Sequence, residues 1–135
     1  MNRRDLLGVI VLGATLTFGS AASAIDQTYD QKAFDAAHAA GKPILVEVTA
    51  PWCPVCKAQV PILSRLKGEA RFKNLASFTI DFDSQKDLLK KLNVQKQSTL
   101  IVFKGKQEVG RSTGDTNAGS IEQLLAKSLR HGSPT

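Results

Sequence analysis

Residues 44–57 read Ile-Leu-Val-Glu-Val-Thr-Ala-Pro-Trp-Cys-Pro-Val-Cys-Lys, and this stretch contains the strongest structural and chemical signal in the chain. Its first six residues form a nearly continuous β-branched run, which is typical of a strand buried on both faces of a parallel sheet. Pro51 ends that run, and the apolar spacing from Cys53 to Leu66 predicts a helix directly after it. The two cysteines therefore fall where a strand ends and a helix begins.

The position of Cys53 at a helix start suits it to nucleophilic chemistry. A thiol is a poor nucleophile until it ionises, and the free N–H groups and positive dipole end of a helix N-terminus favour the thiolate. Cys56 lies three residues further along the same helical face, where it can displace a partner captured by Cys53. A structural disulfide is the competing interpretation, but so short a loop restricts the unfolded chain little. The spacing therefore favours a redox pair in which Cys53 attacks and Cys56 resolves.

A metal site is another alternative for the cysteine pair. Two cysteines are too few for a four-cysteine zinc site, and His38 and His131 stand at no ligand spacing from a further candidate. We therefore expect no cofactor and no metal held by a single chain. A metal or iron–sulfur site shared between two chains, or completed by glutathione, stays open, as does a non-catalytic binding domain with an inert disulfide.

The first 24 residues have the pattern of an export signal. Arg3 and Arg4 form a basic head, residues 6–18 carry no charge, and Ala22-Ser23-Ala24 has the small-residue spacing of a signal peptidase site. The apolar stretch is too short to span a bilayer, which takes about 20 residues. The paired arginines also fit twin-arginine export, and an uncleaved anchor is the alternative. We expect cleavage near Ala24, which leaves residues 25–135 as a single domain in the periplasm.

The overall composition is that of an ordinary globular protein. The 135 residues are 42% hydrophobic and 22% charged, which excludes collagen-like, coiled-coil and mostly disordered chains. The formal net charge is +6, and the lysines are interspersed with acids, as in Lys86-Asp87, rather than gathered in a stripe with aromatic residues. We therefore expect no nucleic-acid partner.

Hydrophobic patterning predicts further elements on both sides of the cysteine motif. Helices are expected over Gln31–Ala40, after a cap at Ser84, and from about Ile121 to an end near Gly132; strands are expected over Leu75–Phe82, Thr99–Phe103 and Gln107–Ser112. Helices and strands then alternate in the order α, β, α, β, α, β, β, α. This order indicates one α/β layer structure.

The chain resembles the thioredoxin family over most of its length after the leader. The resemblance rests on residues 52–57, on Pro61 five residues after the second cysteine, on Ile80-Asp81, and on residues 99–105 with Gly114, which are similar to the family's closing hairpin. It implies a thioredoxin fold, with a central mixed β-sheet of about four strands flanked by helices on both faces. It also implies thiol–disulfide exchange with protein substrates and, together with the leader, a monomeric periplasmic member of the family.

Glu47 is a charged residue inside an otherwise apolar strand, six residues before Cys53. A carboxylate in that position is desolvated, which suits it to take or give a proton. The resemblance implies that it deprotonates Cys56, since thioredoxins usually carry an acidic residue here, mostly Asp. The alternative is a strand-end side chain that reaches water.

Two departures from the family pattern concern the surroundings of the cysteines. Pro54-Val55 replaces the Gly-Pro typical of cytosolic reductants, so Val55 has a backbone N–H that we expect to reach the Cys53 thiolate and to shift the potential some tens of millivolts toward oxidising. Ser98 stands where the family usually has a cis-proline. Because a non-proline cis peptide bond costs about 2.5–4 kcal/mol, we predict a trans Gln97–Ser98 bond and, without the proline ring, exposed sulfurs.

The resemblance implies Trp52, Pro54, Val55, Ser98 and Thr99 as substrate-binding residues. Trp52 is expected to lie over the cysteines, with an ordinary core tryptophan as the alternative. The short form lacks the helical insertion typical of dedicated periplasmic oxidases. We therefore expect a reductase of exported disulfides that takes electrons from a membrane thiol–disulfide donor, with an oxidase or isomerase of the same fold as the alternative.

Overall fold

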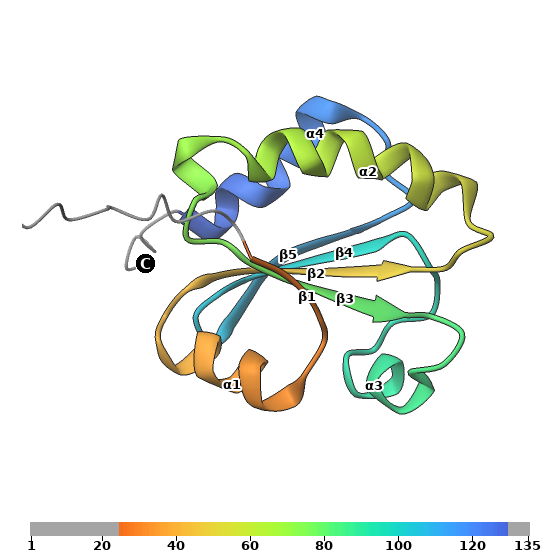
Figure 1. Cartoon of the computed structure of the whole chain (residues 1–135), viewed down its shortest axis with the longest axis horizontal. Coiled ribbons are helices and arrows are strands. Elements are labelled where there is room, and N and C mark those ends of the chain that lie inside the picture. Colours follow the sequence, from red (N-terminus) through yellow and green to blue (C-terminus); the bar gives the residue numbers. More distant parts are fainter. Residues whose placement is uncertain (1–24, 130–135) are drawn as a thin grey trace, which may run out of the picture.

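The computed structural model describes residues 25–129, which form a mixed sheet with helices on both faces (Figure 1). The strands are β1 (Ile25–Thr28), β2 (Pro43–Thr49), β3 (Ala76–Asp81), β4 (Thr99–Lys104) and β5 (Gln107–Thr113), in the spatial order β1-β3-β2-β4-β5. The helices are α1 (Gln31–Ala39), α2 (Pro54–Lys67), α3 (Lys86–Lys91) and α4 (Ala118–Ala126), with 3-10 turns η1 (Ala70–Phe72) and η2 (Lys127–Leu129). Helices α2 and α4 lie on one face of the sheet, and α1 and α3 on the other.

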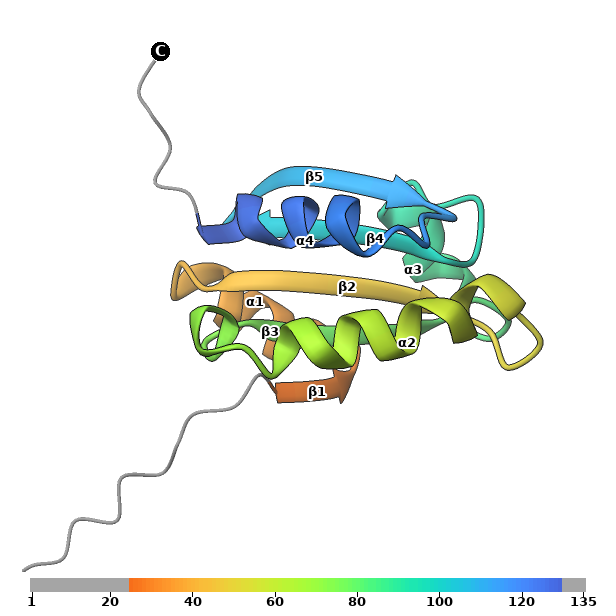
Figure 2. The ribbon, with the colours of Figure 1, turned by 90° about the horizontal axis from the view of Figure 1, so that it is seen from above.

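Helix α2 is the crossover between two parallel strands. Strands β2 and β3 run parallel, with Ile44 opposite Ala76 and Thr49 opposite Asp81, so the chain must cross the sheet to pass from one to the other. Seen from above, α2 lies along β2 and β3 and brings the chain back to the start of β3 (Figure 2). The first turn of α2 is therefore held at the end of the central strand.

Alternation along the strands divides the core of the sheet into two large clusters, apart from a small one at the cysteines. The cluster on the α1 side is rich in aromatic rings; its members include Tyr29, Phe34, Ile44, Val46, Phe78, Ile101 and Phe103. The cluster on the α2 and α4 side is mostly aliphatic; its members include Leu45, Leu63, Leu66, Leu100, Val102, Ile121 and Leu125. Because successive strand side chains point to opposite faces, Glu47 faces the same side as Leu45.

The structure confirms the predicted fold class and corrects details of its elements. The sheet has five strands rather than about four, because Ile25–Thr28 pairs in parallel with β3 at the edge. Ser84 is not the cap of α3, which begins after Gln85 without a side-chain cap bond. The export signal over residues 1–24 and the helix end near Gly132 lie outside the described residues. Within residues 25–129, no helix is long and apolar enough to cross a membrane.

Candidate functional site

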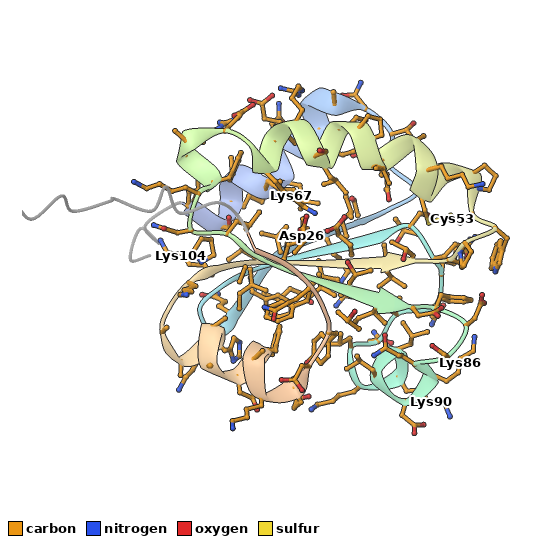
Figure 3. The ribbon with its side chains drawn as sticks, viewed as in Figure 1. Asp26, Cys53, Lys67, Lys86, Lys90 and Lys104 are labelled. Carbon is orange, nitrogen blue, oxygen red and sulfur yellow. A yellow bond between two sulfur atoms is a disulfide. The ribbon has the colours of Figure 1, made fainter. Side chains whose placement is uncertain are left out.

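The two cysteines occupy the first turn of α2. Cys53 is its N-cap residue and Pro54 its first helical residue, where a missing N–H breaks no bond and a fixed φ favours the helix. Cys53 and Cys56 form a disulfide, with their Cα atoms 5.3 Å apart. The predicted placement of the pair at a helix start is therefore confirmed. Figure 3 shows Cys53 at this end of α2.

A backbone amide donates to the Cys53 sulfur, but it is not that of Val55. The Cys56 N–H donates to Cys53 Sγ at 3.1 Å. An N-cap side chain accepts from the second or third helical residue, and here it is the third. In the disulfide form the donor is therefore Cys56. The expected Val55 contact concerns the Cys53 thiolate and stays a prediction.

Both cysteines are buried, which contradicts the expectation of exposed sulfurs. Cys53 is 0% exposed and Cys56 5% exposed. They pack with Ala50, and Val55 and Phe82 lie against this cluster. The sulfurs are therefore covered although the segment at Ser98 lacks the proline ring.

Ser98 occupies that segment in a constrained conformation. The Gln97–Ser98 bond is trans, as predicted, and Ser98 has a φ of 58°, in the left-handed region that non-glycine residues seldom adopt. The Ser98 N–H donates to Val48 O at 2.8 Å, and Ser98 O accepts from the Gly114 N–H at 3.0 Å and from Gln59 Nε2 at 3.2 Å. Both main-chain polar groups of this buried residue are therefore paired inside the protein, and those bonds hold the strained backbone.

The residues predicted to bind substrate divide into two groups. Trp52 and Pro54 are exposed and Val55 is half-buried, whereas Ser98 and Thr99 are buried. The Thr99 hydroxyl is engaged internally, since it donates to the Lys96 carbonyl at 2.8 Å and lies 3.0 Å from the Thr113 hydroxyl. Of the five, only Trp52, Pro54 and Val55 offer side chains to a partner beside the disulfide.

Trp52 is not a core tryptophan, because 55% of its surface is exposed. Its indole N–H donates to Asp83 Oδ2 at 2.9 Å, and its ring packs edge-on against Phe82 with 6.5 Å between centroids. Lys86 Nζ lies 4.2 Å from the centre of the same Phe82 ring. Since Phe82 also packs against the cysteines, these contacts hold an exposed aromatic face next to the redox pair.

Glu47 is buried and paired with a cation. Only 9% of the residue is exposed, which is inconsistent with a strand-end side chain that reaches water. Its Oε2 accepts from Lys67 Nζ at 2.5 Å and from the Ser77 hydroxyl at 2.7 Å, and Lys67 Nζ also donates to Asp26 Oδ1 at 2.8 Å. Figure 3 shows Lys67 and Asp26 together, away from Cys53 along the sheet. The Glu47 carboxylate is therefore held toward the end of α2 opposite the cysteines.

Lys67 remains charged despite its burial. Burial by itself lowers the pKa of the ammonium group, but the carboxylates of Glu47 and Asp26 outweigh that effect and raise the pKa above 10.5. Sequence reasoning missed Lys67, Ser77 and Gln59. The signal for Gln59 was present, because Cys56, Gln59, Leu63 and Leu66 share the spacing of one buried helix face.

Within residues 25–129, no three or more His, Cys, Asp or Glu side chains lie close enough together to hold a metal ion. A metal or iron–sulfur site shared between two chains, or completed by glutathione, needs groups from outside one chain. A measurement of metal content decides that alternative. The geometry that the single chain does provide is a disulfide at the start of a helix.

Comparison with known proteins identifies the family. The thioredoxin family model matches residues 25–127. The H-type thioredoxin of Fagopyrum esculentum is 33% identical over 105 residues, covering 78% of this chain and 84% of that protein, and thioredoxin-2 of Saccharomyces cerevisiae is 30% identical over 106 residues, covering 78% and 99%. The crystal structure of Trxlp from Edwardsiella tarda EIB202 matches with a TM-score of 0.73 and 40% identity, covering 75% of this chain and 98% of that one. The chain belongs to the thioredoxin family and is a thiol–disulfide oxidoreductase with Cys53 and Cys56 as its redox pair.

Proposed function

We propose that this protein is an exported reductase that breaks disulfide bonds in other exported proteins. The observation that carries the proposal is the Cys53 sulfur at the N-cap of α2, with a backbone N–H on it and its partner sulfur within bonding reach. In the reduced protein, the same N–H and the helix dipole stabilise a thiolate at Cys53.

The reaction transfers two electrons to the substrate. The Cys53 thiolate attacks one sulfur of the substrate disulfide, that S–S bond breaks, and the other substrate sulfur leaves as a thiolate that takes a proton from water. Cys56 then loses its proton and attacks Cys53 Sγ, which releases the second substrate thiol. The protein ends in the disulfide form seen here.

Two groups concern the proton of Cys56: a carbonyl that can accept its hydrogen bond, and a carboxylate that can take the proton. Val48 O lies 3.9 Å from Cys56 Sγ and can accept the S–H hydrogen bond of the reduced thiol. We assign removal of the proton to Glu47, which faces the side of the sheet covered by the helix that carries Cys56. Because Lys67 and Ser77 hold the carboxylate away from the cysteines, it can take the proton of Cys56 only through an intervening group such as a water molecule.

The export and the direction of electron flow rest on the sequence. Residues 1–24 have a basic head, an apolar stretch and a small-residue cleavage pattern. The described chain passes from β2 through α2 to β3 without the insertion that the resemblance attributes to dedicated periplasmic oxidases. A membrane thiol–disulfide protein would restore the reduced pair after each turnover.

The equilibrium potential against glutathione tests the direction. A potential of about −270 mV supports the reductase. A potential of about −120 mV supports an oxidase and overturns the reductase proposal. Reduction of insulin separates an enzyme from an inert binding domain, and metal analysis of the purified protein tests the shared-cluster alternative. N-terminal sequencing of protein from a periplasmic extract should begin at Ile25; retention of the leader in the cytoplasm would contradict export.

A further inference from the structure

Gln59 is a polar residue at a core position of α2, one turn after Cys56. It is 2% exposed, and its neighbours on the buried helix face are Cys56, Leu63 and Leu66. An amide in such surroundings is costly unless its polar atoms are bonded. Leucine or methionine would fill the same space without that cost, so the partners of the amide indicate what Gln59 does.

The side-chain nitrogen of Gln59 bonds two segments that lie far from it in the sequence. Nε2 donates to Ser98 O at 3.2 Å and to Asp115 O at 2.9 Å. Both acceptors are backbone carbonyls, which cannot donate, so only the NH₂ group of the amide can face them. Ser98 lies directly before β4 and Asp115 lies two residues after β5. Gln59 therefore ties the entrance of one strand and the exit of the next to the helix that carries both cysteines.

The hydrogen bond from Gln59 to Ser98 is linked, through Val48, to the resolving cysteine. The Ser98 N–H donates to Val48 O, and Cys56 Sγ lies against the same carbonyl oxygen at 3.9 Å. Gly114 N–H shares Ser98 O with Gln59, so the loop after β5 is held by the same group. Because Ser98 has a left-handed backbone that is not its relaxed state, its position depends on these bonds.

We propose that Gln59 is a positioning residue for exchange with protein substrates. It holds the Ser98 and Asp115 segments against α2, so that the protein surface beside the disulfide is already in place when a substrate arrives. A protein disulfide brings polypeptide on both sides of its cysteine, and that polypeptide needs a surface beside the redox pair. Ser98 itself is buried, so the part of the tied segments that can meet it is the loop of Asp115, where Gly114 and Thr116 are exposed. A small disulfide needs only the Cys53 sulfur. This assignment deepens the proposed reductase function and rests on it.

Donor-free variants at this position test the proposal. Gln59→Met and Gln59→Leu keep the approximate volume and remove both N–H donors. For each variant, reduction of insulin and reaction of the reduced protein with 5,5′-dithiobis(2-nitrobenzoic acid) are measured. We expect kcat/KM for insulin to fall about tenfold, mainly through KM, while the small disulfide reacts within about twofold of the wild-type rate.

A matched control separates this effect from general loss of a buried hydrogen bond. Ser128→Ala removes a buried donor to Leu125 O in η2, on a segment that carries no part of the site, and should leave the ratio of the two rates unchanged. Far-UV circular dichroism and thermal unfolding establish that each variant is folded. Having two donor-free variants keeps the test available if one of them does not fold.

The outcomes separate failure of the positioning role of Gln59 from failure of the reductase function. An unchanged ratio in the donor-free variants, whether both substrates are unaffected or both slow equally, overturns the role of Gln59. A wild-type protein that reacts with the small disulfide but never with insulin overturns the reductase function itself, and the positioning role with it.

Discussion

The two faces of the sheet differ in chemistry although the same strands form both. On the α1 face, the rings of Tyr29, Phe34, Phe78 and Phe103 pack against one another, with Phe34 and Phe103 at 5.3 Å between centroids. On the α2 face, the aliphatic cluster is accompanied by buried polar residues, among them Glu47, Gln59 and Ser77. One face therefore stabilises the fold, and the other also positions the redox pair.

The contrast originates in the alternation of a single strand. Val46 and Val48 of β2 point into the aromatic cluster, while Glu47 between them points to the opposite side. An apolar contact tolerates other side chains of similar volume, whereas a buried hydrogen bond requires a specific donor and acceptor. Substitutions on the two faces should therefore separate loss of stability from loss of exchange.

The largest expected effect is on activity and comes from Cys53 on the α2 face. Cys53→Ser should lower insulin reduction by on the order of 10³-fold or more, because the nucleophilic sulfur is lost. Cys56→Ser should instead accumulate a stable mixed disulfide between Cys53 and its substrate. Non-reducing electrophoresis with mass spectrometry detects that adduct. If Cys53→Ser rather than Cys56→Ser accumulates the adduct, the assigned order of attack is wrong.

The next effect is on stability and comes from the aromatic face. Phe34→Ala should lower the free energy of unfolding by about 3–5 kcal/mol, because it removes a buried ring from contact with Tyr29, Phe78 and Phe103. Urea unfolding measures this loss. The kcat/KM of the folded variant at low temperature should match the wild type. A parallel loss of exchange would show that the two faces are not functionally separate.

A smaller effect on stability, with a distinct effect on rate, is expected at Glu47. Glu47→Gln should cost about 1.5–3 kcal/mol, because a neutral amide replaces the carboxylate that accepts a charge-assisted hydrogen bond from Lys67. Stopped-flow fluorescence of Trp52, the single tryptophan, should show slower resolution by Cys56 across neutral pH.

A second substitution separates these two roles of Glu47. The double variant Glu47→Gln with Lys67→Met should recover stability to within about 1 kcal/mol of the wild type, since no uncompensated buried charge remains. Its exchange should stay slow. Wild-type exchange rates in either variant would remove Glu47 from the mechanism.

The smallest expected effect is the loss of stability in alkali, to which each face contributes one group. The pKa of Lys67 is raised above 10.5, because its two carboxylate partners outweigh burial, and burial and Asp35 raise the pKa of Tyr29 above 10.0. A folded-state pKa above the unfolded value contributes stability that is complete below the unfolded pKa and is lost as pH rises through the folded pKa. The free energy of unfolding should therefore fall above about pH 10.

Two single variants show how much each face of the sheet contributes to the loss of stability in alkali. Lys67→Met, on the α2 face, should make the free energy of unfolding fall less steeply with pH. Tyr29→Phe, on the α1 face, should do the same. Urea unfolding at a series of alkaline pH values measures both slopes. Identical slopes in the wild type and both variants would contradict these assignments.

Most helices and strands could be predicted because their patterns are local. The helix at Gln31–Ala39 and the strand at Thr99–Lys104 lie within a residue of their predicted bounds. Strand β1 was missed because Ile25–Thr28 is short and half polar, so only its pairing with β3 makes it a strand. The prediction that Ser84 caps α3 was wrong for a related reason. Several polar residues can precede a helix, and packing selects among them.

The candidate site was only partly predictable. The cysteines and their place at a helix start follow from residues 44–57, and the trans bond before Ser98 follows from the cost of the alternative. The burial of both sulfurs does not follow, because it depends on how Ala50, Val55 and Phe82 pack around them in the fold. The direction of the Glu47 carboxylate likewise depends on Lys67, which is 20 residues away in the sequence.

The amino-acid sequence by itself determined the fold class, the two reactive sulfurs and the helix that activates one of them, because each depends on neighbouring residues and short-range periodicity. Only the tertiary structure decided which polar groups meet across the sheet, namely Gln59 with Ser98 and Asp115, and Glu47 with Lys67 and Ser77. Hydrogen bonds form at fixed distances between groups that the chain brings together from separate segments. Their partners are therefore a property of the packed fold.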